Sequence, residues 1–233
     1  MPAPDQPMRQ RGTSTFFPGL DKAWLARLAR ETTARRLAAG ENLWSTGQRA
    51  DHFTLIDSGV IQIERMTPTG EGIVLGLFGA GESIGLPAVL QRGRYPSDAT
   101  ALTSDTNVLR IRAKPVLEAL AESQPLTMAL NRALLLHTSV LRAKIDIVTA
   151  GSVPRRLAAL FLHLIARFGN ETGEGSVRIE LGLTREQISQ FVSTRVETVS
   201  RVLSRWQKAG WLQSGRGQIE ILRVDMLRRV LGN

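Results

Sequence analysis

The sequence predicts an α+β protein with an N-terminal antiparallel β-roll of the jelly-roll type, one long helix and a C-terminal winged helix-turn-helix. Three observations carry this prediction. The first half contains short alternating segments separated by glycines, the middle has a 3.5-residue apolar repeat, and two short amphipathic helices stand before a hairpin near the end. With 233 residues, of which 42% are hydrophobic, the chain is long enough for two domains.

Composition narrows the classes of protein that the chain can be. No apolar run approaches the roughly 18 residues that a membrane span needs. The Pro-rich start at residues 1–7 lacks the apolar core of a signal peptide. We therefore expect a cytoplasmic protein with no membrane partner, in which residues 1–20 form an N-terminal tail.

The Gly-punctuated region predicts the β-roll. A short helix is expected at 21–32, and after it glycines supply the positive φ angles of tight turns between strands. The expected strands are 53–56, 60–66, 73–78, 99–103 and 108–112. Many short strands with regular turns are typical of a sandwich or jelly roll, so we assign residues 21–124 to this domain.

A long helix at 125–150 follows a short helix that Pro125 interrupts. Its apolar positions repeat at spacings of four and three, which is a coiled-coil seam of about two heptads. The seam consists of Leu134, Thr138, Leu141, Ile145 and Val148. Pairing with a second copy of the chain is favoured, and the alternative is an ordinary core stripe. Residues 151–154 break the helix, either as a hinge or as a plain turn, before a helix at 155–168, a loop at 170–175 and a strand at 177–181.

The region 184–217 predicts the helix-turn-helix and its wing. Thr184 and Gln187 have capping-box spacing before an apolar stripe, and Ser193 interrupts the first helix. Thr194 and Glu197 repeat the capping spacing, and a second amphipathic helix then runs to Gly210, a C′ residue. Two short helices joined by a tight turn are the arrangement of a DNA-reading motif, in a domain that we place at 151–233.

The outer face of the second helix carries the groups that suit base reading. Glu197, Ser200 and Arg201 share one side, because they are three and four residues apart. Arg can donate two hydrogen bonds to guanine, Glu can accept from cytosine, and Ser can do either. Alternatively, Glu197 only caps its own helix, and Ser200 and Arg201 belong to a solvated face. Phosphate contacts are expected from Arg185, Arg195, Thr198, Arg205, Lys208 and Arg216.

Charge supports a nucleic-acid partner for the C-terminal part. From residue 150 onward there are 13 Lys or Arg against 7 Asp or Glu, a net of +6, whereas residues 1–149 carry 17 against 14, a net of +3. The shorter part therefore holds most of the basic surplus, as in a module that binds phosphates.

The second helix closely resembles the recognition helix of the CRP/FNR family, bacterial regulators named for the cyclic-AMP receptor protein and the fumarate and nitrate reduction regulator. The FNR branch has the signature V-E-T-x-S-R, and residues 196–201 read Val-Glu-Thr-Val-Ser-Arg. Val196 stands where the cyclic-AMP branch has an arginine. The resemblance implies a TTGAT-N4-ATCAA-type palindrome, a homodimer, a cyclic-nucleotide-binding-like β-roll as sensor, and contact with RNA polymerase.

The resemblance also suggests where an effector pocket would lie. Gly81, Glu82, Ile84 and Gly85 match the start of the family's cyclic-AMP pocket. Leu86 then replaces a ribose-binding Glu, and Pro96 precedes Ser97 where the phosphate-binding Arg belongs. Arg94 is two residues away and is either a substitute or a solvated loop charge. The candidate pocket is completed by Leu141 of the long helix.

The absence of cysteine and the few histidines bear on which group the chain could bind. An iron–sulfur cluster like that of the oxygen-sensing FNR members is excluded, because the chain has no cysteine ligands. Thiol-based redox sensing is excluded for the same reason. Haem stays open, since the start Met1-Pro2 resembles that of a CO-sensing member and His52 and His137 are available. A cyclic nucleotide, an unidentified small molecule and the lack of any effector stay open as well.

The sequence therefore predicts a dimeric transcription regulator, not an enzyme, that activates or represses by binding near promoters. One rival is a ligand-binding β-roll protein whose basic C-terminal domain docks an acidic protein. A cupin-like metalloenzyme is the second rival, but the β region contains only one histidine, His52, where such a metal site needs a cluster.

Overall fold

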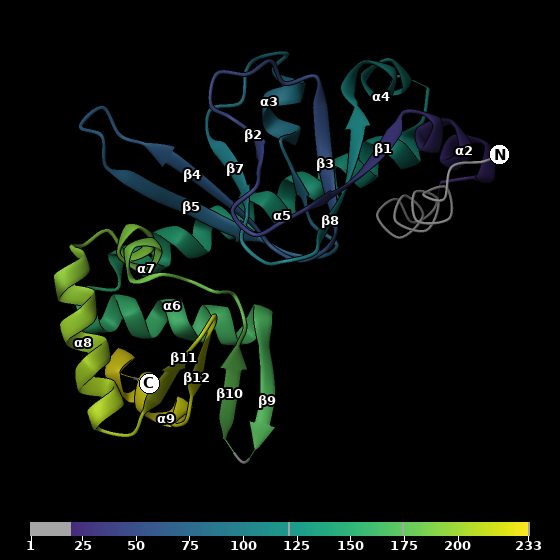
Figure 1. The fold of residues 1–233 in the computed structure, drawn as a ribbon. Coiled ribbons are helices and arrows are strands. Elements are labelled where there is room, and N and C mark those ends of the chain that lie inside the picture. The colour runs from purple at the N-terminus through teal and green to yellow at the C-terminus, as the bar shows by residue number, and fades with distance from the viewer. Residues whose placement is uncertain (1–19, 121, 174, 233) are drawn as a thin grey trace. The chain divides into compact units, whose positions relative to one another are not determined.

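The structure is a computed structural model, and it describes residues 20–120, 122–173 and 175–232. Of the tail expected at residues 1–20, only Leu20 lies within the described part, and Met1 and Pro2 lie outside it. The chain divides into two compact units (Figure 1). The first comprises the chain up to Arg65 together with Leu77–Val140, and the second comprises Met66–Gly76 with Leu141–Asn233. No helix in the described part is long and apolar enough to cross a membrane.

The β-roll consists of two four-stranded sheets, with strand orders β1-β8-β3-β6 and β2-β7-β4-β5. The strands are β1 (Thr32–Leu37), β2 (Asn42–Trp44), β3 (His52–Ser58), β4 (Ile61–Met66), β5 (Gly72–Phe78), β6 (Ser83–Ile84), β7 (Asp98–Ala101) and β8 (Thr106–Arg112). The predicted fold class is confirmed, and all five expected strands are present with small shifts at their ends. Three further strands, the six-residue β1 and the short β2 and β6, are not among the predicted ones.

Antiparallel pairing places the apolar residues of β3 and β8 opposite one another. Phe53 pairs with Ile111 and Leu55 with Leu109, and all four side chains are buried. Because alternate residues of a strand face opposite sides of the sheet, this register gives one continuous apolar face. The same spacing of apolar residues was the signal that predicted these strands.

The helices of the first half are α2 (Lys22–Arg30), α3 (Leu86–Leu90), α4 (Ala113–Ala119) and α5 (Gln124–Thr149). Asp21 caps α2 by accepting from the Trp24 N–H at 2.8 Å. The long helix begins at Gln124, so Pro125 stands in its first turn, where a missing N–H costs nothing. The short helix α4 already ends at Ala119, so Pro125 does not interrupt it as predicted. One face of α5 is buried, and it includes Leu126, Leu130, Ala133, Val140 and Ile147.

The second unit contains α6 (Val153–Phe168), α7 (Arg185–Val192), α8 (Val196–Lys208) and α9 (Val224–Leu231), with a sheet of order β11-β12-β10-β9. Its strands are β9 (Gly169–Gly173), β10 (Ser176–Ile179), β11 (Leu212–Gly215) and β12 (Gln218–Ile221). The helix expected at 155–168 begins two residues earlier, because Pro154 fits the first turn. Its core includes Phe161 and Trp206, whose ring centroids are 6.4 Å apart.

The prediction of a loop at 170–175 is wrong. Gly169–Gly173 forms strand β9, which pairs antiparallel with β10. Four of its five residues are exposed, so the segment has no apolar alternation from which a strand could be predicted. Backbone pairing with β10 alone makes it a strand.

Candidate nucleic-acid interface

Helix α7 begins as its sequence predicts. The hydroxyl of Thr184 accepts from the Gln187 N–H at 3.1 Å, and the Gln187 side chain accepts from the Thr184 N–H at 2.9 Å. This reciprocal capping box satisfies two of the amides that a helix start leaves free. Ile188 and Phe191 of the same helix are buried, which fixes the side that α7 turns inward.

The turn between α7 and α8 differs from the prediction at one residue. Ser193 has φ 52° and ends α7, as expected from its position. However, the N-cap of α8 is Arg195 and not Thr194. The Thr194 N–H donates to the Ser189 carbonyl at 3.0 Å, so it belongs to the end of α7 and is not available to the Glu197 carboxylate. Glu197 therefore does not close a capping box with Thr194.

Helix α8 separates its two faces as the sequence pattern requires. Val199, Leu203 and Trp206 are buried, with exposed fractions of 0, 0 and 3%. On the other side Glu197 and Arg201 are exposed, and Ser200 is half-buried. The three groups proposed to read bases thus share the outer side of one helix, and each is within reach of a ligand that approaches from solvent.

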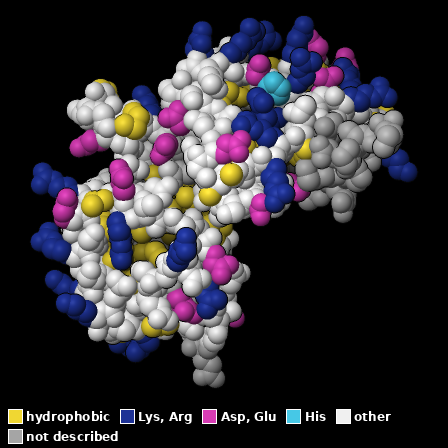
Figure 2. Space-filling model, viewed as in Figure 1, with side chains coloured by type: hydrophobic (Ala, Val, Ile, Leu, Met, Phe, Trp, Pro, Cys, Tyr) yellow, Lys and Arg dark blue, Asp and Glu magenta, His cyan; other side chains and the backbone are white. Residues whose placement is uncertain are grey.

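The proposed phosphate contacts fall into two groups. Arg195, Arg205 and Lys208 are exposed on or beside α8, and Arg216 is exposed at the turn of the β11–β12 wing. Figure 2 shows basic side chains gathered along the edge of the molecule where α8 lies. Thr198 is half-buried.

Arg185 differs from the other proposed contacts, because it is engaged inside the unit. Its guanidinium donates to the Gln207 side chain at 3.4 Å and to the Ser214 hydroxyl at 3.5 Å. Burial lowers the pKa of Arg185. The residue links α7 to α8 and to the wing, and its Nη1 is buried, so the side chain is not placed to meet a phosphate through that group.

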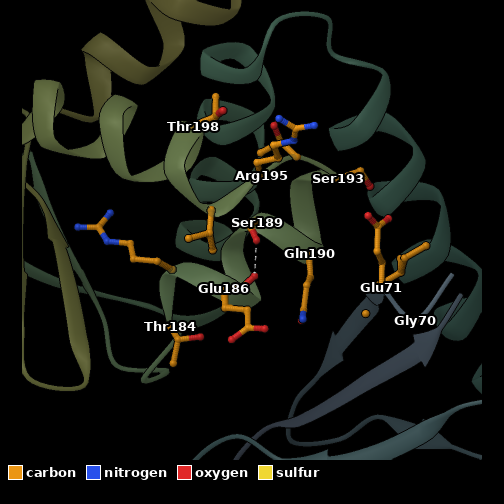
Figure 3. Close-up of a pocket in the computed structure, with 14 residues that line it drawn as sticks. Gly70, Glu71, Thr184, Glu186, Ser189, Gln190, Ser193, Arg195 and Thr198 are labelled. Carbon is orange, nitrogen blue, oxygen red and sulfur yellow. Dashed lines mark hydrogen bonds between the residues drawn. The ribbon is translucent and has the colours of Figure 1, made fainter.

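A cavity of about 1010 Å³ opens beside these residues (Figure 3). Residues 70–73 of the β4–β5 hairpin line one side, and residues of α7, the turn and the start of α8 line the other. Arg195 and Thr198 contribute to its wall, and Glu71 reaches in from the hairpin. The hairpin approaches α7 closely, because a Cβ atom on Gly72 would lie 2.7 Å from the amide nitrogen of Gln190.

The residues proposed for an effector pocket in the β-roll are mostly engaged by the protein itself. Ile84, Leu86 and Ser97 are buried, with exposed fractions of 0, 2 and 6%. The Glu82 carboxylate accepts from the Gly79 N–H at 2.6 Å, and Arg94 donates to the Gly47 carbonyl at 2.7 Å. Gly81 is exposed in a turn, and Leu141 is partly exposed on α5 at 37%.

Two aromatic side chains that the sequence analysis did not single out fill the space beside Gly85. Trp44 and Tyr95 are stacked, with ring centroids 4.2 Å apart, and both are nearly fully buried. The Trp44 indole N–H donates to the Ser97 carbonyl at 3.0 Å. A Cβ atom on Gly85 would lie 3.1 Å from the Tyr95 ring and 3.3 Å from the Trp44 ring. Gly85, with φ 81°, is therefore required by protein packing whether or not a ligand binds.

The two histidines considered for haem have different surroundings. His52 Nδ1 is 2.6 Å from the Asp51 carboxylate. His137 stacks on Phe78 at 5.2 Å, its buried Nδ1 has no hydrogen-bond partner among the residues that the structure describes, and burial lowers its pKa. No group of three or more His, Cys, Asp or Glu side chains that could hold a metal ion occurs within the described residues.

Comparison with known proteins agrees with this architecture. The profile described as a cyclic nucleotide-binding domain matches residues 34–123, and the profile of a Crp-like helix-turn-helix domain matches residues 155–230. The chain is 25% identical over 198 residues to a CRP-like cAMP-activated global transcriptional regulator of Mycobacterium tuberculosis H37Rv, covering 85% of this chain and 88% of that protein. It is 28% identical over 195 residues to the fumarate and nitrate reduction regulatory protein of Escherichia coli K12, covering 83% and 76%.

Solved structures share the fold. A CRP-family transcriptional regulator from Thermus thermophilus superposes with a TM-score of 0.73 at 20% identity, over 85% of this chain and 97% of that one. FixK2 from Bradyrhizobium japonicum gives 0.72 at 19% identity, over 85% and 96%. With both domain profiles matched in order and with relatives of both branches along most of its length, the chain belongs to the CRP/FNR family of transcription regulators.

Proposed function

We propose that the protein is a homodimeric regulator that reads a TTGAT-N4-ATCAA-like palindrome through α8. The observation that carries the proposal is the outer face of α8, where Glu197 and Arg201 are exposed and Ser200 is half-buried. A bidentate Arg–guanine pair and a Glu–cytosine bond are the contacts that such a face can make in a major groove. The proposed domains are a sensor at 21–124, a dimerisation helix at 125–150 and a DNA-binding domain at 151–233.

Dimerisation is supported by the outer side of α5. Large apolar side chains stand exposed there, including Leu141 at 37% and Ile145 at 59%. Thr138 is also exposed, and Leu134 and Val148 are half-buried, so the whole predicted seam remains accessible in a single chain. A second copy would cover these side chains, and a two-fold dimer would present two recognition helices to the two halves of a palindrome.

The β-roll is proposed to pass a signal to the DNA-binding domain, and the regulator is proposed to touch RNA polymerase near its promoters. An effector or a redox or gas signal fits the family's domain order. The packing of Trp44 and Tyr95 against Gly85 supports a signal other than cyclic AMP, because these rings occupy the space beside Gly85.

The test is fluorescence anisotropy of the effector-free protein with a TTGAT-N4-ATCAA duplex, a TGTGA dyad and a scrambled duplex. Selective binding to the TTGAT dyad, with an affinity that falls steeply as salt rises, is the expected result. Equal binding to all three duplexes would reject the half-site. Tight binding to an acidic protein, with no preference among the duplexes, would favour the rival function of a protein-docking domain.

A further inference from the structure

The C-terminal end of α7 leaves four consecutive carbonyls, at residues 190–193, without a backbone partner in the described part of the chain. The N–H groups of Ser193 and Thr194 both donate to the Ser189 carbonyl. The helix therefore ends without backbone donors for the carbonyls that follow Ser189. Orphan carbonyls at a helix end need other donors when the site is sheltered from water.

Two cationic side chains from other helices supply all the missing donors. The Lys144 ammonium of α5 donates to the Gln190 carbonyl at 3.3 Å and also to the Phe191 carbonyl. Nη1 of Arg156 in α6 donates to the Val192 carbonyl at 2.8 Å and to the Ser193 carbonyl at 3.0 Å. We call Lys144 and Arg156 the carbonyl clamp.

Lys144 is held in surroundings that are costly for a charge. The residue is only 9% exposed, and burial lowers its pKa to about 8. Its ammonium also lies 4.8 Å from the centre of the Phe191 ring. The two carbonyls, the ring and the negative end of the α7 dipole offset the loss of water around the cation.

Arg156 reaches in two directions. Besides the two carbonyls at the end of α7, its Nε–H donates to the Gly151 carbonyl at 3.1 Å. Gly151 lies in the break between α5 and α6. One guanidinium therefore joins that break to the turn that precedes the recognition helix.

We propose that Lys144 and Arg156 are positioning residues of the DNA reader. Helix α8 begins at Val196, three residues after Ser193, so the direction in which α8 leaves the turn depends on how the end of α7 is held. Lys144 immediately precedes Ile145 of the proposed dimer seam, and the clamp therefore ties the reader to the helix that sets the two-fold axis. This inference rests on the proposed DNA-reading function.

The test compares clamp variants with a matched control at constant salt. Lys144→Met and Arg156→Met remove one positive charge and the donors. Arg142→Met removes one charge from an exposed side chain of the same α5 helix. Anisotropy is measured with the palindromic and the scrambled duplex. Selectivity is the Kd for the scrambled duplex divided by the Kd for the palindrome. In the clamp variants we expect it to fall about tenfold, as when one base-reading pair is lost, while Arg142→Met keeps the wild-type selectivity.

A conservative variant separates positioning from folding. Arg156→Lys retains a cation that can donate to the Val192 and Ser193 carbonyls but lacks the Nε–H that donates to the Gly151 carbonyl, so it should recover part of the selectivity that Arg156→Met loses. Circular dichroism reports whether each variant is folded, and if Lys144→Met does not fold, Lys144→Gln takes its place, because it removes the charge but keeps a polar side chain. Folded clamp variants with wild-type selectivity would overturn the proposal.

Hydrogen exchange without DNA tells this proposal apart from the proposed function. The Thr194 and Thr198 amides, which donate to the Ser189 and Arg195 carbonyls, should exchange about tenfold faster in Lys144→Met than in Arg142→Met, because the turn opens locally more often. If the wild-type protein shows no selectivity for the palindrome, the DNA-reading function fails, and exchange still decides whether the clamp holds the turn. Unchanged exchange would reject the clamp itself.

Discussion

The recognition helix and the β-roll differ in how far their proposed functional side chains are exposed to solvent. In α8, Glu197 and Arg201 are exposed and free to meet a partner. In the β-roll, Ile84, Leu86 and Ser97 are buried, and Trp44 and Tyr95 fill the neighbouring space. Both regions match their family profiles, so a profile match alone does not show that a site is open.

The difference follows from what each kind of site needs. A DNA reader needs polar groups on one side of a helix whose other side is buried, and both conditions follow from spacing along the chain. A ligand pocket needs empty space, which any side chain from elsewhere in the sequence can occupy. Four experiments test this contrast.

The largest effect is expected for Trp44→Ala in the β-roll. Trp44 is buried, stacked on Tyr95 and bonded to the Ser97 carbonyl, so its truncation should lower the free energy of unfolding by about 3–5 kcal/mol. Urea unfolding measures the change. Trp24→Ala, in the same unit but half-buried, is the control and should cost less.

Thermal unfolding of the wild-type protein tests whether the β-roll has room for a cyclic nucleotide. Wild-type protein with cyclic AMP should show no rise in melting temperature, because the aromatic pair occupies the space beside Gly85. A clear rise in the wild type, or a Trp44→Ala protein as stable as the wild type, would contradict the picture of a filled interior.

A second effect, on DNA binding, is expected for Ile145→Glu. The side chain is 59% exposed in the single chain, and a carboxylate there would be buried without a partner if α5 pairs with its copy. We expect monomers in sedimentation analysis and a loss of about 100-fold in affinity for the palindrome, since both half-sites must be held together.

Ser139→Glu is the matched control for the seam, because Ser139 is exposed on α5 but outside the 134–148 seam positions. It should remain dimeric with wild-type affinity. A dimer in both variants would place the interface elsewhere.

A smaller and more selective effect is expected for Arg201→Ala in α8. Losing one bidentate contact should cost about 1–3 kcal/mol and relax the preference at one guanine. Lys208→Ala, on the same helix, should weaken matched and scrambled DNA alike and reduce the salt dependence. Equal losses on both duplexes for Arg201→Ala would remove it from the base-reading set.

The smallest effect concerns pH and His163 of α6. Burial, with a further contribution from Arg167, lowers the pKa of His163 from 6.5 to about 4. In the unfolded chain the ring binds a proton near pH 6.5, so the folded state loses stability as pH falls from about 6.5 to 4 and loses nothing above 6.5. Because solvent reaches part of the ring, we expect a loss of about 1–2 kcal/mol.

Urea unfolding of the wild type and of His163→Gln across this pH range measures the contribution. As pH falls from about 6.5 to 4, the free energy of unfolding of the wild type should decrease relative to that of His163→Gln, because only the wild type has a buried ring that resists protonation. A constant difference would mean that His163 is protonated equally in the folded and unfolded chains.

Local patterns along the chain determine much of the fold. The Thr184–Gln187 capping box, the positive φ at Ser193 and the two faces of α8 all depend on residues a few positions apart. The five main strands were likewise visible from apolar alternation. The strand at Gly169–Gly173 was not, because its pairing with β10 leaves no trace in side-chain pattern.

Thr194 shows how a local signal can be overridden. Its spacing to Glu197 matches a capping box, yet its N–H is already taken by the Ser189 carbonyl at the end of the preceding helix. Two helices that follow closely compete for the same amide, and the left-handed turn at Ser193 decides in favour of α7.

The order of the domains and the face of α8 that a partner can meet thus follow from the amino-acid sequence, because helical periodicity is a property of neighbouring residues. The stacking of Trp44 on Tyr95 and the contact of Lys144 with carbonyls 46 and 47 residues away depend on the folded structure. Such contacts join groups with no fixed spacing, and they form because folding brings together an orphan carbonyl and a donor, or a space and the ring that fills it.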